Sequence, residues 1–154
     1  MTSFTTIALI KVGLAASVSL VVVTEDIRHR HIPNLLCALI LLIGMFSAAL
    51  SRGWAGLQDG VLGALLAFAI FLIPYTVGGL GGGDVKLMAA FGSVIGTSGV
   101  LPALFLVAVA GSITAMLYLL RDRSEGVAAT VAVPYAPAIV AGSLLVTFSQ
   151  IGGR

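Results

Sequence analysis

The sequence contains very little charge and almost no cysteine. Only 9% of its 154 residues are charged, 59% are hydrophobic, and the mean hydropathy is +1.15. About 25% of the residues of a soluble globular domain are charged, so this composition excludes a water-soluble domain. The one cysteine, Cys37, lies in an apolar run. It excludes an intrachain disulfide and a cysteine-ligated zinc site, and it is predicted to be a small buried side chain.

The chain also lacks long polar segments. Its apolar residues form six runs, each bounded by charge, glycine or proline, at 4–25, 33–51, 57–77, 85–99, 100–120 and 127–149. Because about 20 apolar residues cross a bilayer as a helix, the sequence predicts an all-α membrane protein with six transmembrane helices. Residues 1–154 are expected to form one domain. The small-xxx-small pairs Gly56/Gly60 and Gly92/Gly96 predict close helix packing.

The distribution of basic residues predicts an orientation. They fall into two groups on opposite sides of the six expected spans, five on one side and three on the other: Arg28, Arg30, Lys86, Arg121 and Arg123 against Lys11, Arg52 and Arg154. Cytoplasmic segments are enriched in Lys and Arg. We therefore expect the first group to face the cytoplasm, the N- and C-termini to lie outside, and the protein to reside in the cytoplasmic (inner) membrane.

Two aspartates lie where a membrane protein avoids charge. Asp26 closes the first apolar run and Asp84 opens the fourth. An ionisable group at such a place is costly and indicates a functional site. Two intervening crossings bring both residues to the cytoplasmic side. The helix from Asp84 to Gly99 is about 24 Å long against a hydrocarbon core of about 30 Å, which predicts that Asp84 lies inside the membrane edge, in a hydrated pocket.

Such a pair of carboxylates can hydrolyse a peptide bond without metal. One carboxylate is ionised and takes a proton from water, while the other is protonated and donates. Structural alternatives exist for each residue. Asp84 can serve as a helix cap, and Asp26 can be an interfacial charge balanced by Arg28 and Arg30. Asp59, on the outer side, is expected to mark only the start of a helix.

The glycine-rich segment before Asp84 is expected to shape the site. Gly78 and Gly83 have the spacing of a phosphate-binding loop, but Asp84 replaces the required Lys and no Ser or Thr follows, so nucleotide binding is not expected. Gly81, Gly82 and Gly83 are expected to adopt positive φ and to let an extended substrate pass close to the backbone.

Other candidates for function are weaker. His29 and His31 would share a face of an extended segment, but no third ligand is evident and arginines interleave them, so we expect no metal and no cofactor. Lys86 follows Asp84 by two positions. It is expected to pair with an aspartate, to contact substrate, or to serve only as a cytoplasmic charge.

The residues resemble the signatures of one family. Asp26-Ile27-Arg28-His29-Arg30-His31-Ile32-Pro33-Asn34 resembles the first signature of type IV prepilin peptidases. Gly79-Leu80-Gly81-Gly82-Gly83-Asp84-Val85-Lys86 resembles their second, the Gly-x-Gly-Asp signature shared with presenilin-type aspartic proteases. Pro134-Tyr135-Ala136-Pro137 resembles the Pro-x-x-Pro stretch that opens the last core helix of the family. The resemblance covers nearly the whole chain.

The resemblance implies a membrane-embedded aspartic endopeptidase of pilus biogenesis, which cleaves the leader peptide of prepilins after a glycine at the cytoplasmic membrane edge. Asp26 and Asp84 would be the catalytic residues. Six further residues are expected to bind substrate or shape the site: Gly81, Gly82, Gly83, Lys86, Pro134 and Pro137. The short form, without the cysteine-rich domain of the larger enzymes, resembles peptidases of tight-adherence (Flp-type) pilus systems, with archaeal preflagellin peptidases as a near alternative. N-methyltransferase activity is not expected.

Two other functions remain open from the sequence. One is a small ion-coupled transporter with Asp26 and Asp84 as ion ligands. Inverted repeats in the sequence would favour this function, and no such repeat is evident. The other is a non-catalytic membrane subunit of a pilus or secretion system. Only the peptidase requires both aspartates and no ion gradient. Its expected partners are a prepilin with an apolar N-terminal helix and the lipid bilayer, without nucleic acid. Homo-oligomers are left open.

Overall fold

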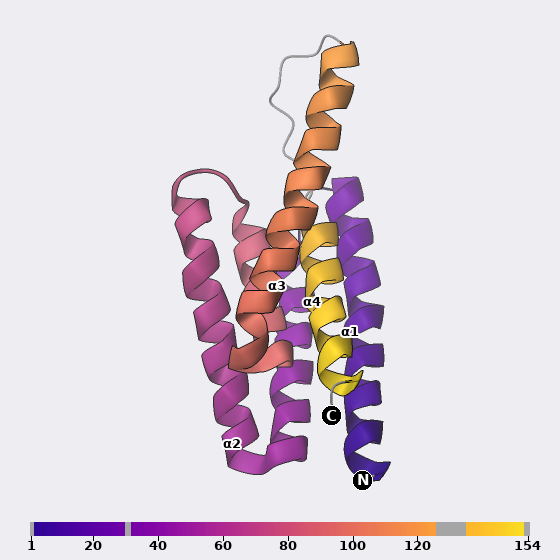
Figure 1. The fold of residues 1–154 in the computed structure, drawn as a ribbon, viewed down its shortest axis with the longest axis vertical. Coiled ribbons are helices and arrows are strands. Elements are labelled where there is room, and N and C mark those ends of the chain that lie inside the picture. The colour runs from indigo at the N-terminus through magenta and orange to yellow at the C-terminus, as the bar shows by residue number, and fades with distance from the viewer. Residues whose placement is uncertain (1, 30–31, 126–134, 153–154) are drawn as a thin grey trace.

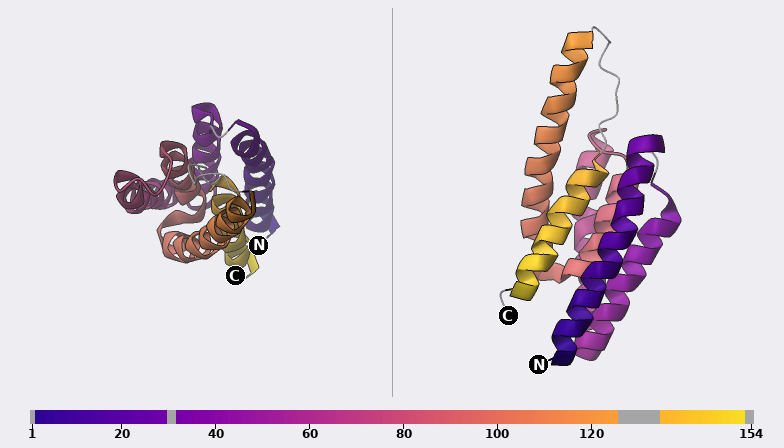
Figure 2. Two further views of the ribbon diagram at one scale, coloured as in Figure 1. Left: turned by 90° about the horizontal axis from the view of Figure 1, so that it is seen from above. Right: turned by 90° about the vertical axis from the view of Figure 1, so that its right-hand side faces the viewer.

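The computed structural model describes residues 2–29, 32–125 and 135–152, and this part of the chain is entirely helical apart from short connections. Its four helices are α1 (Thr2–His29), α2 (Asn34–Thr76), α3 (Gly82–Glu125) and α4 (Ala136–Gly152). The predicted all-α class is confirmed. Figures 1 and 2 show the helices as one bundle in which α2 and α3 fold back on themselves.

The prediction of six transmembrane helices is wrong. There are four helices among the described residues, and only two of them contain spans long and apolar enough to cross a membrane, Asn34–Thr76 and Gly82–Leu117. The sequence places helix ends near residues 52–56 and at 99, where glycine and charge interrupt the apolar runs. The structure instead continues α2 and α3 through these places, each with one sharp bend.

Both bends lie at a glycine. Gly53 has φ 57° and ψ −139° inside α2, and Gly96 has φ 68° and ψ 177° inside α3. Positive φ is strained for residues with a Cβ and costs glycine nothing, which explains the residue type at these two positions. Each helix therefore has two arms: 34–52 and 54–76 in α2, and 82–95 and 97–125 in α3.

The bend in α3 frees backbone carbonyls that other helices satisfy. Lys11 of α1 donates from Nζ to the Val94 carbonyl at 2.9 Å, and Gln150 of α4 donates from Nε2 to the Ile95 carbonyl at 2.9 Å. Carbonyls at a helix end lack an intrahelical partner and must be satisfied elsewhere when buried. The two side chains therefore hold the end of the first arm of α3 between α1 and α4.

Asp59 connects the bend of α2 to the bend of α3. The sequence analysis did not predict this connection. It lies within α2, and its Oδ1 accepts hydrogen bonds from the Thr97 backbone N–H at 3.0 Å and from the Thr97 hydroxyl at 2.6 Å. Its Oδ2 pairs with Arg52. The prediction that Asp59 only starts a helix is therefore wrong, because it connects the bend of α2 to the bend of α3.

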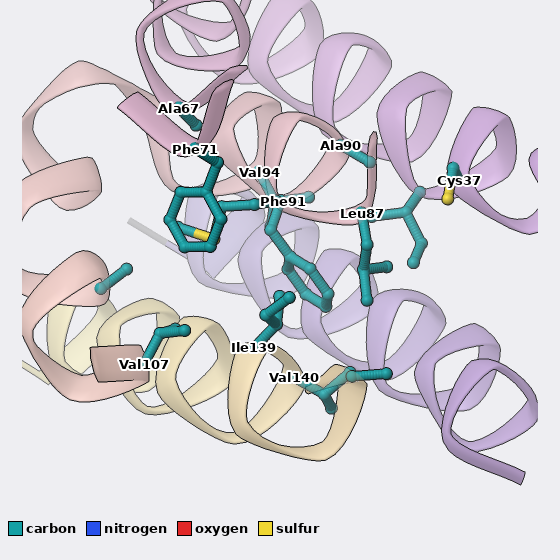
Figure 3. Packing of buried hydrophobic residues seen from close by; sticks show 14 of the residues in the cluster. Cys37, Ala67, Phe71, Leu87, Ala90, Phe91, Val94, Val107, Ile139 and Val140 are labelled. Atoms are coloured by element: carbon teal, nitrogen blue, oxygen red, sulfur yellow. The ribbon is translucent and has the colours of Figure 1, made fainter. Parts of the chain in front are cut away.

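The core forms where the first arm of α3 packs against α2 and α4. Figure 3 shows Leu87 and Phe91 of this arm pointing toward Ile139 of α4, and all three are fully buried. Gly63 and Gly92 lie so close that a Cβ on either would collide with the other's carbonyl oxygen. Glycine at these positions lets α2 and α3 approach closely, as small residues do at helix contacts in membranes.

The outer surface of the bundle is apolar. Large apolar side chains are more than half exposed on all four helices, among them Leu20, Phe46, Trp54, Ile73, Phe105 and Phe148. A soluble monomer rarely exposes so much contiguous apolar surface. With the two candidate spans, this surface fits a protein embedded in a lipid bilayer. Cys37 is buried, as predicted.

Candidate active site

Asp26 lies in the last turn of α1 and binds the first residue of α4. Only 7% of the residue is exposed, and its Oδ2 accepts a hydrogen bond of 3.2 Å from the backbone N–H of Ala136, the first residue of α4. The first N–H groups of a helix have no intrahelical acceptor, and they attract negative charge. Pro137 follows at the second position and has no N–H to satisfy. Asp26 is therefore held by a helix that lies far away in the sequence.

Asp84 is the third residue of α3 and is equally buried, with 7% exposed. Its Oδ2 accepts a hydrogen bond of 3.1 Å from the Gly81 N–H, while its own N–H donates to the Gly81 carbonyl at 3.1 Å. The first bond is the one that an acidic residue at the third helical position makes in a capping box, whereas Gly81 has no side chain to make the other. Asp84 is therefore not the N-cap residue considered from the sequence, but its side chain binds the N–H of the residue before the helix, and this bond holds the carboxylate in one orientation.

The two aspartates form a pair at one end of the bundle, and we call them the acid pair. In Figure 1 the last turn of α1 and the first turns of α3 and α4 lie below the projecting end of α3, at the ends of these helices that point away from the N and C labels. The Asp26 carboxylate acts electrostatically on that of Asp84. The structure therefore places the two residues that the sequence analysis singled out within electrostatic range of each other, Asp26 beside the start of α4 and Asp84 in the first turn of α3.

The glycine segment has a different conformation from the one predicted. Gly78, with φ 78°, is the residue with positive φ, and Gly81, Gly82 and Gly83 do not share it. The Gly78 N–H donates to the Tyr75 carbonyl at 3.0 Å and the Gly79 N–H to the Pro74 carbonyl at 2.8 Å. These two bonds are those of a Schellman motif, which ends α2.

Close packing explains Gly83 but not Gly82. A Cβ at Gly83 would lie 3.2 Å from the Cβ of Ile32, and one at Gly82 would lie 3.5 Å from the Tyr75 ring. Ile32 is buried in the core cluster, so it leaves little room beside Gly83. The sequence analysis missed Ile32, because an isoleucine before a proline gives no signal of what it contacts.

Lys86 does not lie beside the acid pair. Its Nζ donates to Oδ1 of Asn34 at 3.1 Å, and the residue is exposed. At 3.6 residues per turn, Lys86 and Asp84 are about 200° apart around α3 and face opposite sides. The prediction that Lys86 binds substrate is not tested. Pro134 lies outside the described residues, whereas Pro137 is in the first turn of α4.

Of the two histidines, the structure describes His29. His29 Nδ1 lies 2.9 Å from Oε2 of Glu25, one helical turn earlier, and His31 lies outside the described residues. Among residues 2–29, 32–125 and 135–152, no three or more His, Cys, Asp or Glu side chains are close enough together to hold a metal ion.

Comparison with known proteins decides the family. The model of the type IV leader peptidase family matches residues 13–116, which include both aspartates. The chain belongs to this family. The resemblance seen in the two signatures is thereby confirmed.

Two curated relatives of this leader peptidase family carry the same name, prepilin leader peptidase/N-methyltransferase. The one from Bacillus subtilis (strain 168) is 35% identical over 134 residues, which is 84% of this chain and 51% of the relative. The one from Xanthomonas campestris pv. campestris is 25% identical over 133 residues, which is 80% of this chain and 44% of the relative. The chain thus spans about half the length of these relatives. No solved structure matches it significantly.

Proposed function

We propose that this chain is an aspartic endopeptidase that removes the leader peptide of prepilins at the edge of the cytoplasmic membrane. The observation that carries the proposal is the acid pair, in which two buried aspartates from different helices lie within electrostatic range of each other. Family membership and the names of the curated relatives support the same activity. The peptidase activity alone is proposed here.

The acid pair suits general acid–base hydrolysis. Two close carboxylates do not both ionise easily, so the pair holds one proton between them and its titration belongs to both residues. The ionised member takes a proton from water as the water oxygen attacks the scissile carbonyl carbon. The protonated member gives its proton to the leaving amine as the C–N bond breaks. Hydrogen bonds from Ala136 and Gly81 fix the two carboxylates before the substrate arrives.

The glycine segment suits an extended substrate. Gly79 and Gly81 are exposed and carry no side chain, so another backbone can come close to the acid pair. An unwound stretch of prepilin can pair with this backbone as an added strand does. We assign Gly81, Gly82, Gly83 and Pro137 to shaping this part of the site, and Asp26 and Asp84 to the chemistry.

The charges at the same end support a cytoplasmic active site. Arg28 is exposed in the last turn of α1, which also carries Asp26, and Lys86 is exposed near the start of α3, which carries Asp84 on another side. Basic residues at the ends of membrane helices are enriched on the cytoplasmic side. We therefore place the acid pair toward the cytoplasm, in a protein that crosses the membrane more than once.

The test uses Asp26→Asn and Asp84→Asn. Each amide keeps an oxygen that accepts the observed backbone hydrogen bond but removes the proton-transfer group, so the fold should persist. Each should lower cleavage of a Flp-type prepilin by at least about a hundredfold, since general acid–base groups contribute 10²–10⁴-fold. The double variant should lose little more, because the residues act as one unit.

The assay is leader removal followed by mass spectrometry, with purified protein in detergent. Asp59→Asn is the matched control, since Asp59 lies at the bends and not at the acid pair. Either acid-pair variant retaining more than about a hundredth of wild-type turnover would contradict the assignment. Detergent removes any ion gradient, so wild-type cleavage there also speaks against an ion-coupled transporter.

A further inference from the structure

A groove of about 400 Å³ lies between the two arms of α2 and the first arm of α3. It is lined by Asn34, Cys37, Ala38, Leu41, Phe68, Lys86, Ala89 and Ala90. The volume lies within the range of about 300–1,000 Å³ that ligand sites occupy. Two of its residues, Asn34 and Lys86, are polar and hydrogen-bonded to each other, and the other six are apolar. The groove thus has one cationic end and an apolar floor.

The groove lies around α3 from the side that carries Asp84. Around α3, the residues Lys86, Ala89 and Ala90 lie about 140–240° from Asp84, on the opposite side of the helix. The side that Asp84 shares is filled by buried Leu87 and Phe91. A ligand held by Lys86 and Ala89 therefore lies on a different side of α3 from the Asp84 carboxylate. The charge of Asp84 still reaches Cys37 of the lining, so competition with a prepilin peptide is part of the test.

The polarity of the groove changes with depth along the candidate spans. Asn34 begins one span, and Lys86 lies about 6 Å along the other, within reach of the membrane surface for a long side chain. Leu41 lies about 10 Å further along α2 than Asn34, and Phe68 lies about 12 Å before the end of its span at Thr76. The polar end is thus at headgroup depth and the apolar floor at acyl-chain depth.

Lys86 and Asn34, at the cationic end of the groove, can still donate hydrogen bonds to an anion. Lys86 is exposed and donates to a neutral amide, and no carboxylate pairs with it in the part of the chain that the structure describes. Because lysine only donates, Asn34 accepts through Oδ1 and keeps its Nδ2 hydrogens for another acceptor. Basic pockets between membrane helices on the cytoplasmic side bind anionic lipid headgroups.

We propose that this groove binds one anionic phospholipid. Its phosphate oxygens accept hydrogen bonds from Lys86 Nζ and Asn34 Nδ2, and one acyl chain lies over Ala38, Ala89 and Leu41. The three alanines of the lining, Ala38, Ala89 and Ala90, make this space because their side chains end at Cβ. The proposal concerns a binding site and does not depend on the peptidase activity.

The test is native mass spectrometry of the purified, delipidated full chain titrated with phosphatidylglycerol or phosphatidylcholine. Wild type should bind one phosphatidylglycerol saturably, about tenfold more tightly than phosphatidylcholine. Lys86→Gln should lower phosphatidylglycerol affinity about tenfold by removing a charge-assisted hydrogen bond, and should lower phosphatidylcholine affinity less, because that headgroup carries no net charge. Arg28→Gln is the matched control, because Arg28 is exposed at the same end of the bundle but does not line the groove.

A second variant tests the apolar floor. Ala89→Phe should fill the groove and weaken both lipids, while circular dichroism and thermal unfolding confirm that the helices persist. Equal losses of phosphatidylglycerol in Lys86→Gln and Arg28→Gln would overturn the proposal in favour of unspecific surface charge. Displacement of the lipid by a prepilin peptide, or by millimolar inorganic phosphate alone, would also overturn it, since the groove would then serve a substrate or a free anion.

Discussion

Replacing Gly83 by valine should reduce cleavage while leaving the helical bundle folded. A Cβ at this position would lie 3.2 Å from Cβ of Ile32 and 3.4 Å from its Cγ1 and Cδ1. Ile32 is 5% exposed and packed in the core cluster, so it has little freedom to move aside. The strain is instead relieved by a shift of the first turn of α3, which carries Asp84.

The size of the effect follows from this shift. Overpacking of a close contact costs about 1–3 kcal/mol, which a bundle of this size tolerates. A misplacement of about 1 Å at a catalytic group can cost about 10²-fold in rate. We therefore expect Gly83→Val to lose about a hundredfold in turnover, and Gly83→Ala, which adds only the Cβ, to lose about tenfold.

Two further variants make the assay specific. Gly82→Ala is the matched control, since its Cβ would meet the Tyr75 ring at 3.5 Å, an ordinary contact, and its turnover should stay within about twofold of wild type. Ile32→Ala removes the atoms that collide, so the double variant Ile32→Ala/Gly83→Val should recover about tenfold over Gly83→Val alone. Turnover is measured by mass spectrometry of the cleaved prepilin, with expression and thermal unfolding as checks on folding.

Two results would refute this reasoning. Turnover of Gly83→Val within about threefold of wild type, at normal expression, would mean that the glycines only form a flexible link. Equal losses in Gly82→Ala and Gly83→Ala would mean that the contact with Ile32 is not the cause.

Two more predictions concern the bundle itself. Asp59→Ala leaves the N–H and hydroxyl of Thr97 without their acceptor, so it should destabilise the protein by about 1–3 kcal/mol in detergent unfolding while cleavage per folded molecule stays unchanged. An equal melting temperature would contradict the connection between the bends. Gly92→Leu should prevent folding because it collides with the Gly63 carbonyl, whereas Gly13→Leu, with nothing within 4 Å, should be silent by size-exclusion chromatography. A well-folded Gly92→Leu protein would contradict the close approach of α2 and α3.

The amino-acid sequence alone determined the all-α class of the fold and singled out the two aspartates as candidates for the chemistry. Hydropathy depends only on composition and order, so the all-α class could be predicted directly. Asp26 and Asp84 stand out because carboxylates are rare in apolar runs, and their surrounding residues carry the family signatures. These features are local, and local features can be recognised without knowing what packs beside them.

The number of helices could not be predicted in the same way. A glycine with positive φ ends a helix at Gly78 but lies at a bend inside α2 at Gly53 and inside α3 at Gly96. The local signal is the same at all three places. The contacts of Asp59 with Thr97 and of Lys11 with Val94, between different helices, accompany the bends, and no periodicity in the sequence reports such contacts.

Only the tertiary structure decided how the site is held. The N–H that Asp26 accepts belongs to Ala136, 110 positions away, and the contact of Gly83 with Ile32 depends on how α3 packs against the start of α2. The sequence also left open what Lys86 contacts. A side chain two positions from Asp84 faces another side of the helix, and only the packing of α3 against α2 brings it to Asn34. Sequence spacing fixes which residues share a helix face, whereas packing between distant segments decides what that face meets.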